Sequence, residues 1–352
     1  MSVTVHNNVV SGPEERGIPA HLSYGQFLFD QLKNGGDNIA LINAETGESI
    51  TYRYILQNSV SLAVSLQKLG LKKGDVVGLS SENRFEFVVA ALAVIYCGGI
   101  LSTLNITYSP GEICHLLKIT KPKLIFTSPI TAHNIHDCCS ELSYKCKLIM
   151  FGDFAAVEDC IMYDNLIKEN LNVNDFTLTD VNGVNDTVAV MCSSGTTGLP
   201  KGVELTHVNF LTLSAHMKYY FNYVQKEKNN SIITGLSLIP WFHAYGFITT
   251  LAVMAMNMKI VFLIRFDHEQ YLETIQNYKT HFIHHHTTLP WTGRNKRKSQ
   301  ATILIYSIAF QKSCIFSLFT KVQVHYTTQL TVCHLQQDKH DYNSPTLGCV
   351  PR

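Results

Sequence analysis

The chain has 352 residues, of which 46% are hydrophobic, 10% aromatic and 16% charged. This much apolar material can bury a large core, which excludes disorder over most of the length. The formal net charge of +1 gives no overall field that would attract nucleic acid or an acidic membrane, and we expect no nucleic-acid partner.

The N-terminal segment does not resemble a secretory signal. Residues 1–20 contain no apolar stretch, and Glu14 and Arg16 lie where that stretch would begin. The longest apolar run, residues 247–264, is interrupted by polar side chains. It therefore predicts a buried helix followed by a strand, and no transmembrane segment.

The ten cysteines show no pattern typical of a disulfide framework. No Cys-x-x-Cys pair occurs, and the adjacent Cys138 and Cys139 cannot be paired into such a framework. We expect free thiols in a reducing compartment.

Up to about residue 280, short β-branched runs alternate with helical periodicity, which predicts crossover α/β units around a largely parallel sheet. The expected strands cover residues 76–79, 123–126, 147–151, 187–192, 236–239 and 260–264. The expected helices cover residues 56–69, 85–96 and 208–221, with another between the second and third strands and a last one after Asp267, where Gln270 would complete a capping box.

Two of these helices carry further information. The first is expected to end at Gly70, a typical C-terminal cap residue. The second, residues 85–96, is almost entirely apolar. Because it has no polar face, we expect it to lie inside a layered domain.

The composition changes after Lys279. Residues 281–352 contain no Glu and two Asp against eight Lys and Arg, and seven of the sixteen histidines. We therefore predict two regions. Residues 1–280 form a partial α/β domain, and residues 281–352 form an unrelated, disordered, basic and His-rich tail.

Two features of this tail suggest binding sites. The first is a set of histidines and cysteines that could in principle bind zinc: His284, His285, His286, Cys314, Cys333 and His334. Because their spacing matches no recognised zinc site, we predict no metal site there. The basic cluster over residues 294–298 could contact RNA or act as an import signal, but solvated disorder is the simpler interpretation.

The segment from Ser193 to Gly202, SSGTTGLPKG, directly follows an expected strand and precedes an expected helix. Its glycines let the backbone approach an anion, and its hydroxyls and N–H groups are donors, which is typical of phosphate binding. The charge of Lys201 favours a polyphosphate such as ATP or pyrophosphate. The candidate residues are Ser193, Ser194, Gly195, Thr196, Thr197, Gly198 and Lys201.

Two alternatives to this interpretation fail. A P-loop places Lys directly after its second Gly and Ser or Thr after the Lys, whereas two residues separate Gly198 from Lys201, and Gly202 follows. An ordinary surface turn does not require ten small or donor-bearing residues in succession.

A second motif, Pro240 to Gly246 (PWFHAYG), follows the expected strand at residues 236–239. A single histidine is more often structural than catalytic. The position of His243 after a strand and among three aromatic residues nevertheless favours a site.

These motifs resemble those of the adenylate-forming superfamily, which includes acyl-CoA synthetases, luciferases and nonribosomal peptide adenylation domains. SSGTTGLPKGV followed by a Thr-His pair is similar to its ATP-phosphate loop, and PWFHAYG to its aromatic and histidine motif. Residues 74–78, 81–84 and 107–112 resemble the 4-coumarate:CoA ligase and insect luciferase-like branch, with Ile106 where that branch commonly has proline.

The resemblance implies the layered parallel-sheet lobes of the large N-terminal domain of an acyl-CoA synthetase, incomplete and without the small C-terminal domain. It implies ATP, Mg²⁺ and CoA as cofactors and a fatty or aryl carboxylic acid as substrate. The acid would attack the α-phosphate of ATP to give an acyl-adenylate. In the ligases the thiol of CoA then displaces AMP, whereas luciferases use oxygen in place of CoA. His243 would lie near the substrate carboxylate as a catalytic residue, and Tyr245 would line the acyl or aryl pocket.

The resemblance covers residues 15–280. The family's adenine loop, its Tyr-Gly-x-Thr-Glu and Tyr-Arg-Thr-Gly-Asp segments and its late catalytic lysine are not found in the sequence. We expect a truncated ligase with little or no activity, or alternatively a non-catalytic pseudoenzyme or gene-model fragment that binds only nucleotide or a partner. Many relatives are peroxisomal through a Ser-Lys-Leu-like ending; this chain ends in Val350-Pro351-Arg352, so the cytoplasm is the expected location.

Overall fold

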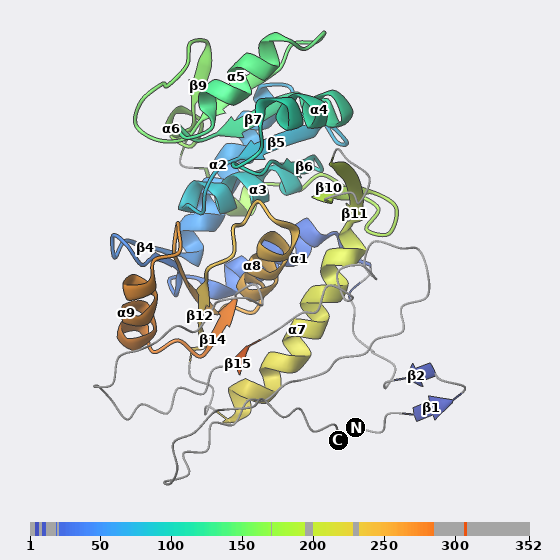
Figure 1. Ribbon diagram of the computed structural model, residues 1–352. Helices are drawn as coiled ribbons and strands as arrows, with labels where there is room; N and C mark the ends of the chain where they lie inside the picture. Colours follow the sequence, from blue (N-terminus) through green and yellow to red (C-terminus); the bar gives the residue numbers. More distant parts are fainter. Residues whose placement is uncertain are drawn as a thin grey trace.

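The computed structural model describes residues 4–6, 9–11, 19, 21–169, 171–193, 200–227, 232–284 and 306–307. Within these residues the main body contains two sheets, the first in the upper part of Figure 1 and β12 and β14 of the second in the lower part. A separate antiparallel pair joins β1 (Thr4–His6) and β2 (Val9–Ser11).

The first sheet has seven strands, which are parallel except for the last pair at one edge. In spatial order they are β11 (Lys201–Thr206), β10 (Thr187–Ser193), β6 (Ile100–Thr103), β5 (Val76–Ser80), β7 (Leu124–Thr127), β8 (Lys147–Met150) and β9 (Cys160–Met162). Only β10 and β11 pair antiparallel.

The second sheet has six strands, and only β3 and β4 pair antiparallel. In spatial order they are β15 (Tyr306–Ser307), β14 (Phe282–His284), β12 (Thr234–Ser237), β13 (Lys259–Phe262), β3 (Ile39–Asn43) and β4 (Ser49–Thr51). Of residues 281–352, the structure describes 281–284 and 306–307, which include β14 and β15.

Five helices share one apolar core with the inner faces of both sheets. They are α1 (Tyr24–Gly35), α2 (Tyr52–Lys68), α3 (Phe85–Tyr96), α7 (His207–Glu227) and α8 (Ala244–Met254). On the outer side, α4 (Pro110–Thr120) and α5 (Ala132–Ser140) cover the first sheet, and α9 (His268–Tyr278) covers the second. The short α6 (Tyr163–Leu166) and a 3₁₀ turn (Val173–Asp175) complete the described helices.

Side-chain alternation along the strands explains these layers. On β7, Leu124 and Phe126 face the shared core, whereas Ile125 faces the cluster under α4 and α5. On β13, Phe262 faces the shared core and Val261 faces α9. Because successive strand residues point to opposite faces, each sheet has two apolar faces and needs helices on both. The predicted α/β class with layered parallel-sheet lobes is confirmed.

Most expected elements are present. Helix α3 has the expected bounds and lies in the shared core, and α2 ends at Lys68, with Gly70 at a φ of +93°. The Asp267 side chain accepts from the Gln270 N–H at 2.9 Å. No helix in the described part of the chain is both long and apolar enough to cross a bilayer.

One expectation about the phosphate loop was wrong. The loop joins β10 to β11 in an antiparallel hairpin instead of leading directly into a helix, and α7 begins only at His207. The reason is the alternation in KGVELT, in which Val203 pairs with Met191, and the buried Leu205 pairs with Ala189. The segment predicted to bind an anion therefore falls between two antiparallel strands, β10 and β11, at one edge of the first sheet.

Candidate functional site

The candidate site begins at the carboxyl end of the first sheet. Strands β6 and β10 run parallel, so both end at the same edge. The hydroxyl of Thr103, the last residue of β6, donates to the Phe242 carbonyl at 2.7 Å, and its Oγ1 lies 3.2 Å from the Sδ of Met191 on β10. The 240–246 segment therefore lies against the end of β6, next to β10, the strand that leads into the predicted phosphate loop.

Asn83 connects this edge to the second sheet. Its side chain, 2% exposed, lies between β5 and α3. The amide donates to the carbonyls of Ile239 at 3.2 Å and Leu263 at 3.3 Å, and its oxygen accepts from the Trp241 N–H at 2.7 Å. Asn83 thus brings the carboxyl ends of β12 and β13 to the carboxyl end of β5. In parallel sheets this is the edge where ligands commonly bind.

His243 is the N-cap residue of α8, and its side chain is exposed. Its Nδ1 accepts from the Tyr245 N–H at 3.3 Å. A neutral imidazole that accepts at Nδ1 carries its proton on Nε2. The cap therefore fixes both the position and the tautomer of the neutral ring.

Two residues in the first turn of α8 define its close packing. Tyr245 is 7% exposed, and burial raises the pKa of its phenol above the ordinary value, so the side chain is neutral. At Gly246, an added Cβ would lie 2.2 Å from the Pro240 carbonyl oxygen. Only glycine permits this approach, which brings the start of α8 against the preceding turn.

The ends of the phosphate loop lie at the same edge. Ser193 ends β10 and pairs with Lys201, the exposed first residue of β11. The remaining predicted loop residues lie outside the described part of the chain; they are Ser194, Gly195, Thr196, Thr197 and Gly198. The structure therefore brings together the loop ends and the strand that contacts the 240–246 segment.

Thr103 and Asn83 were not identified as site residues from the sequence. Asn83 belongs to residues 81–84, which entered the sequence analysis only as part of the family resemblance, although a polar residue directly after a buried strand is a usable signal. Thr103 had no such signal, because no strand was expected over residues 100–103.

The residues that the structure describes include no group of three or more His, Cys, Asp or Glu side chains that could hold a metal ion. The donors predicted for a polyphosphate include N–H groups and the Lys201 ammonium, which suit an anion.

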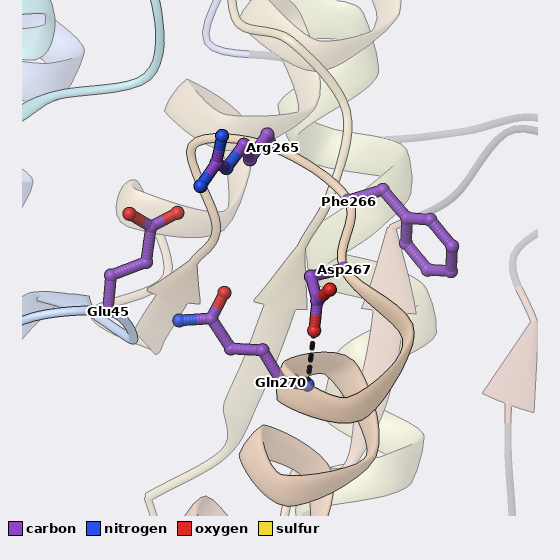
Figure 2. Close-up of a pocket in the computed structure, with 5 residues that line it drawn as sticks. All are labelled: Glu45, Arg265, Phe266, Asp267 and Gln270. Carbon is purple, nitrogen blue, oxygen red and sulfur yellow. Dashed lines mark hydrogen bonds between the residues drawn. The ribbon is translucent and has the colours of Figure 1, made fainter.

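A hollow of about 390 Å³ lies at the carboxyl edge of the second sheet (Figure 2). Glu45, Arg265 and Gln270 point toward it, whereas the Phe266 ring points away. The Gln270 amide extends into this hollow instead of back toward the backbone of Asp267. None of the site residues predicted from the sequence is among its lining residues.

A family model for AMP-binding enzymes matches residues 28–290. The chain is 32% identical over 283 residues to a luciferin 4-monooxygenase of Photuris pensylvanica, covering 77% of this chain and 51% of that protein. It is 33% identical over 270 residues to a 4-coumarate–CoA ligase of Humulus lupulus, covering 74% of this chain and 47% of that protein. The chain thus spans about half the length of these relatives.

The fold agrees with these matches. The solved structure of the luciferase-like enzyme from the nonluminescent mealworm Zophobas morio superposes with a TM-score of 0.71 at 25% identity, covering 78% of this chain and 62% of that one. The two motifs, the layered parallel sheets and the family match agree, and the chain belongs to the AMP-binding enzyme family.

Proposed function

We propose that this chain binds the polyphosphate of ATP at the loop ending in Lys201 and holds a carboxylic acid beside it for AMP-forming activation. The observation that supports this most directly is the Thr103 hydrogen bond to Phe242, because it fixes the His243 segment against the end of β6, the strand that pairs with β10. The acid would be fatty or aryl, and the acyl-adenylate would pass to CoA or to a luciferase-like oxidation.

The chemistry requires two anions to be held together. An exposed ammonium at Lys201 and the N–H groups of the loop would reduce the repulsion between the acid and the phosphates. His243, held as a cap, would face the acid, and Tyr245 would provide an apolar wall. Positioning of this kind contributes much of the barrier reduction in group transfer.

We expect the 352-residue polypeptide to turn over slowly. Its sequence contains no match to the family's adenine loop, its acidic metal segment or its late lysine. Nucleotide binding without catalysis is the second candidate function. It is favoured by the lack of a match to these motifs in the sequence. The domain boundary near residue 280 is also part of this proposal, although β14 and β15 continue the second sheet beyond that residue.

ATP–pyrophosphate exchange with a panel of fatty and aryl acids tests the activity, and calorimetric titration with ATP tests the binding. Titration heat with exchange at background supports binding alone, whereas acid-dependent exchange above background establishes activation. Absence of both would contradict the proposal. The Lys201→Ala variant should bind ATP more weakly, and a Lys118→Ala variant, changed at an exposed lysine of α4, controls for the general loss of positive charge.

A further inference from the structure

The amino edge of the first sheet carries a row of lysines. Two lysines lie at the start of each of three neighbouring strands, β5, β7 and β8. These strands are parallel, so their amino ends lie at one edge, with about 4.8 Å between neighbouring strands. We call this set the lysine row; its members are Lys72, Lys73, Lys121, Lys123, Lys145 and Lys147.

Backbone hydrogen bonds hold the row in register. The Lys123 N–H donates to the Val76 carbonyl at 2.8 Å, and the Lys147 N–H donates to the Lys123 carbonyl at 3.2 Å. The Lys72 N–H donates to the Asp75 carboxylate at 2.8 Å, which closes the turn before β5. The sheet itself therefore fixes the start of each strand next to the others.

In the described part of the chain, two of the six lysines form ion pairs. Lys123 pairs with Asp75 at 2.8 Å, and Lys73 pairs with Asp186 at 2.9 Å. The other four side chains are exposed and form no ion pair with any described residue; they are Lys72, Lys121, Lys145 and Lys147. Unpaired charges of one sign at one edge raise the local potential and attract anions.

Acidic residues near the row do not neutralise it. Glu141 follows α5, and Glu158 and Asp159 precede β9, the strand next to β8. None of the three forms an ion pair with a lysine of the row among the described residues. At the opposite edge, residues 81–84, 128–131 and 151–154 follow the same three strands and contain no lysine. The positive charge is therefore gathered at the amino edge.

Helix ends do not account for the row. A lysine in the last turn of a helix offsets the helix dipole, and Lys118 lies there in α4. Helix α5 ends at Ser140 with no basic residue in its last turn, and Lys145 and Lys147 lie beyond it. Lys72 likewise lies outside α2, in the turn that leads into β5. These lysines are therefore not explained by capping.

An exposed apolar side chain lies close to the row. Ile119, in the last turn of α4, is 50% exposed and belongs to no apolar cluster of the described residues. Lys121, the C-cap of the same helix, follows it by two residues. A single exposed isoleucine is common on soluble proteins. Together with unpaired lysines, however, it suits a lipid surface, which has anionic headgroups over an apolar layer.

We propose that the lysine row and Ile119 bind the surface of a membrane that contains anionic phospholipids. The four unpaired ammonium groups donate to headgroup phosphates and carboxylates, and Ile119 enters the boundary between headgroups and acyl chains. Nucleic acid fits less well, because its base readout and stacking use arginine and aromatic side chains, and the row contains neither. The candidate site lies at the other end of the strands, so it stays accessible in the bound protein.

Co-sedimentation of the full chain with lipid vesicles tests the proposal. The wild type should bind vesicles of equimolar phosphatidylcholine and phosphatidylserine, should not bind phosphatidylcholine alone, and should be released by added salt. This measurement needs no substitution. Absence of binding to the mixed vesicles, equal binding to both, or binding that salt does not weaken would overturn the proposal.

Two triple variants locate the contact. Lys121→Gln/Lys145→Gln/Lys147→Gln should bind the mixed vesicles at least about tenfold more weakly, because each ammonium group near an anionic surface contributes to the affinity. The matched control, Lys296→Gln/Arg297→Gln/Lys298→Gln, removes three charges from the basic cluster of residues 294–298 and should keep the affinity. Equal losses in the two variants, or a loss in the control alone, would overturn the proposal.

Three further measurements sharpen the test. Ile119→Ser should weaken vesicle binding by about threefold at every salt concentration, because the lost contact is apolar; full affinity would contradict insertion of this side chain. Tighter binding of a DNA duplex than of the mixed vesicles would assign the row to nucleic acid and refute a lipid surface. The row variant should bind ATP as the wild type does, so that loss of lipid binding and failure of the proposed function are distinguishable.

Discussion

The two sheets are assembled in different ways. All seven strands of the first come from one continuous stretch, residues 76–206, whereas the second joins β3 and β4 to strands that follow that stretch. The two segments are connected by the parallel pairing of β13 with β3, which includes Ile260 with Leu41. Because contacts between distant residues cost loop-closure entropy, the second sheet depends on the first for its assembly.

The outer faces of the two sheets also differ, in the number of helices that cover them. Two helices, α4 and α5, cover the first sheet, whereas α9 alone is described over the second. Regions with fewer buried apolar contacts open at lower free energy. We therefore expect the second sheet to be the less stable region. Substitutions at its contacts with the first sheet should change the free energy of unfolding most.

The largest effect is expected at the joint made by Asn83. The Asn83→Ala substitution removes three buried hydrogen bonds and leaves their backbone partners unpaired, so the free energy of unfolding should fall by about 4 kcal/mol. Urea unfolding measures this. The matched Asn58→Ala variant loses only an exposed bond to the Tyr54 carbonyl and should change by about 0.5 kcal/mol or less. Equal effects would show that the joint is not important for stability.

The next effect is a pH dependence at the joint between α1 and α7. The Nδ1 of the buried His207 accepts from the Tyr24 N–H at 3.2 Å. Burial lowers the pKa of His207 to about 4, whereas the nearby Asp186 raises this pKa and Lys73 lowers it. Unfolded chains protonate histidine below about pH 6.5, so stability should fall by up to about 3 kcal/mol as the pH falls from there toward 4.

The difference in unfolding free energy between wild type and His207→Asn isolates this effect, because contributions of unchanged carboxylates cancel. An asparagine oxygen can also accept the Tyr24 N–H, so the variant should have a flatter pH profile in this window. Parallel profiles would contradict a neutral His207 in the folded protein.

Two matched glycine substitutions, one in each sheet, compare how much stability an added methyl group costs in each. A Cβ at Gly235 in β12 would lie 2.3 Å from the Phe282 ring, whereas one at Gly78 in β5 would lie 3.0 Å from Ile125. Overpacking should therefore cost about 2 kcal/mol in Gly235→Ala and about 1 kcal/mol in Gly78→Ala. Hydrogen exchange should place the added opening of Gly235→Ala in β12 and β14. The reverse order of stabilities would refute a weaker second sheet.

The smallest effect on stability is expected at Thr103, where the function should change more. Thr103→Val removes the donor to Phe242 at little change in volume and should cost about 1 kcal/mol. If that bond aligns the site, ATP affinity should fall as well. Thr120→Val, which loses a bond to the Leu116 carbonyl within α4, should leave ATP affinity unchanged.

The sequence predicted elements whose signal is local. The bounds of α3 follow from an apolar run that ends before Gly98, and the cap of α9 follows from Asp267. Strand β11 was missed because only Val203 and Leu205 carry its alternation, next to a glycine-rich loop. The division into two sheets could not be predicted, because periodicity does not say that Leu41 pairs with Ile260.

For the candidate site, the predicted residues remain a prediction, and the sequence did not reveal the contacts that position the His243 segment. The motifs around Lys201 and His243 carry chemical signals in their composition. The position of the His243 segment at the edge of the first sheet depends on Thr103 and Asn83, which act through hydrogen bonds to backbone groups far along the chain. Such bonds leave no periodic pattern in a sequence.

The most direct test of the account is calorimetric titration of the purified chain with ATP, pyrophosphate and adenosine, for wild type and Lys201→Ala. The account expects ATP and pyrophosphate to bind, adenosine to bind far more weakly, and the substitution to weaken ATP binding by about tenfold, the loss of one charge-assisted contact. Equal ATP affinity in the two proteins, or binding of adenosine without pyrophosphate, would contradict a polyphosphate site at this loop.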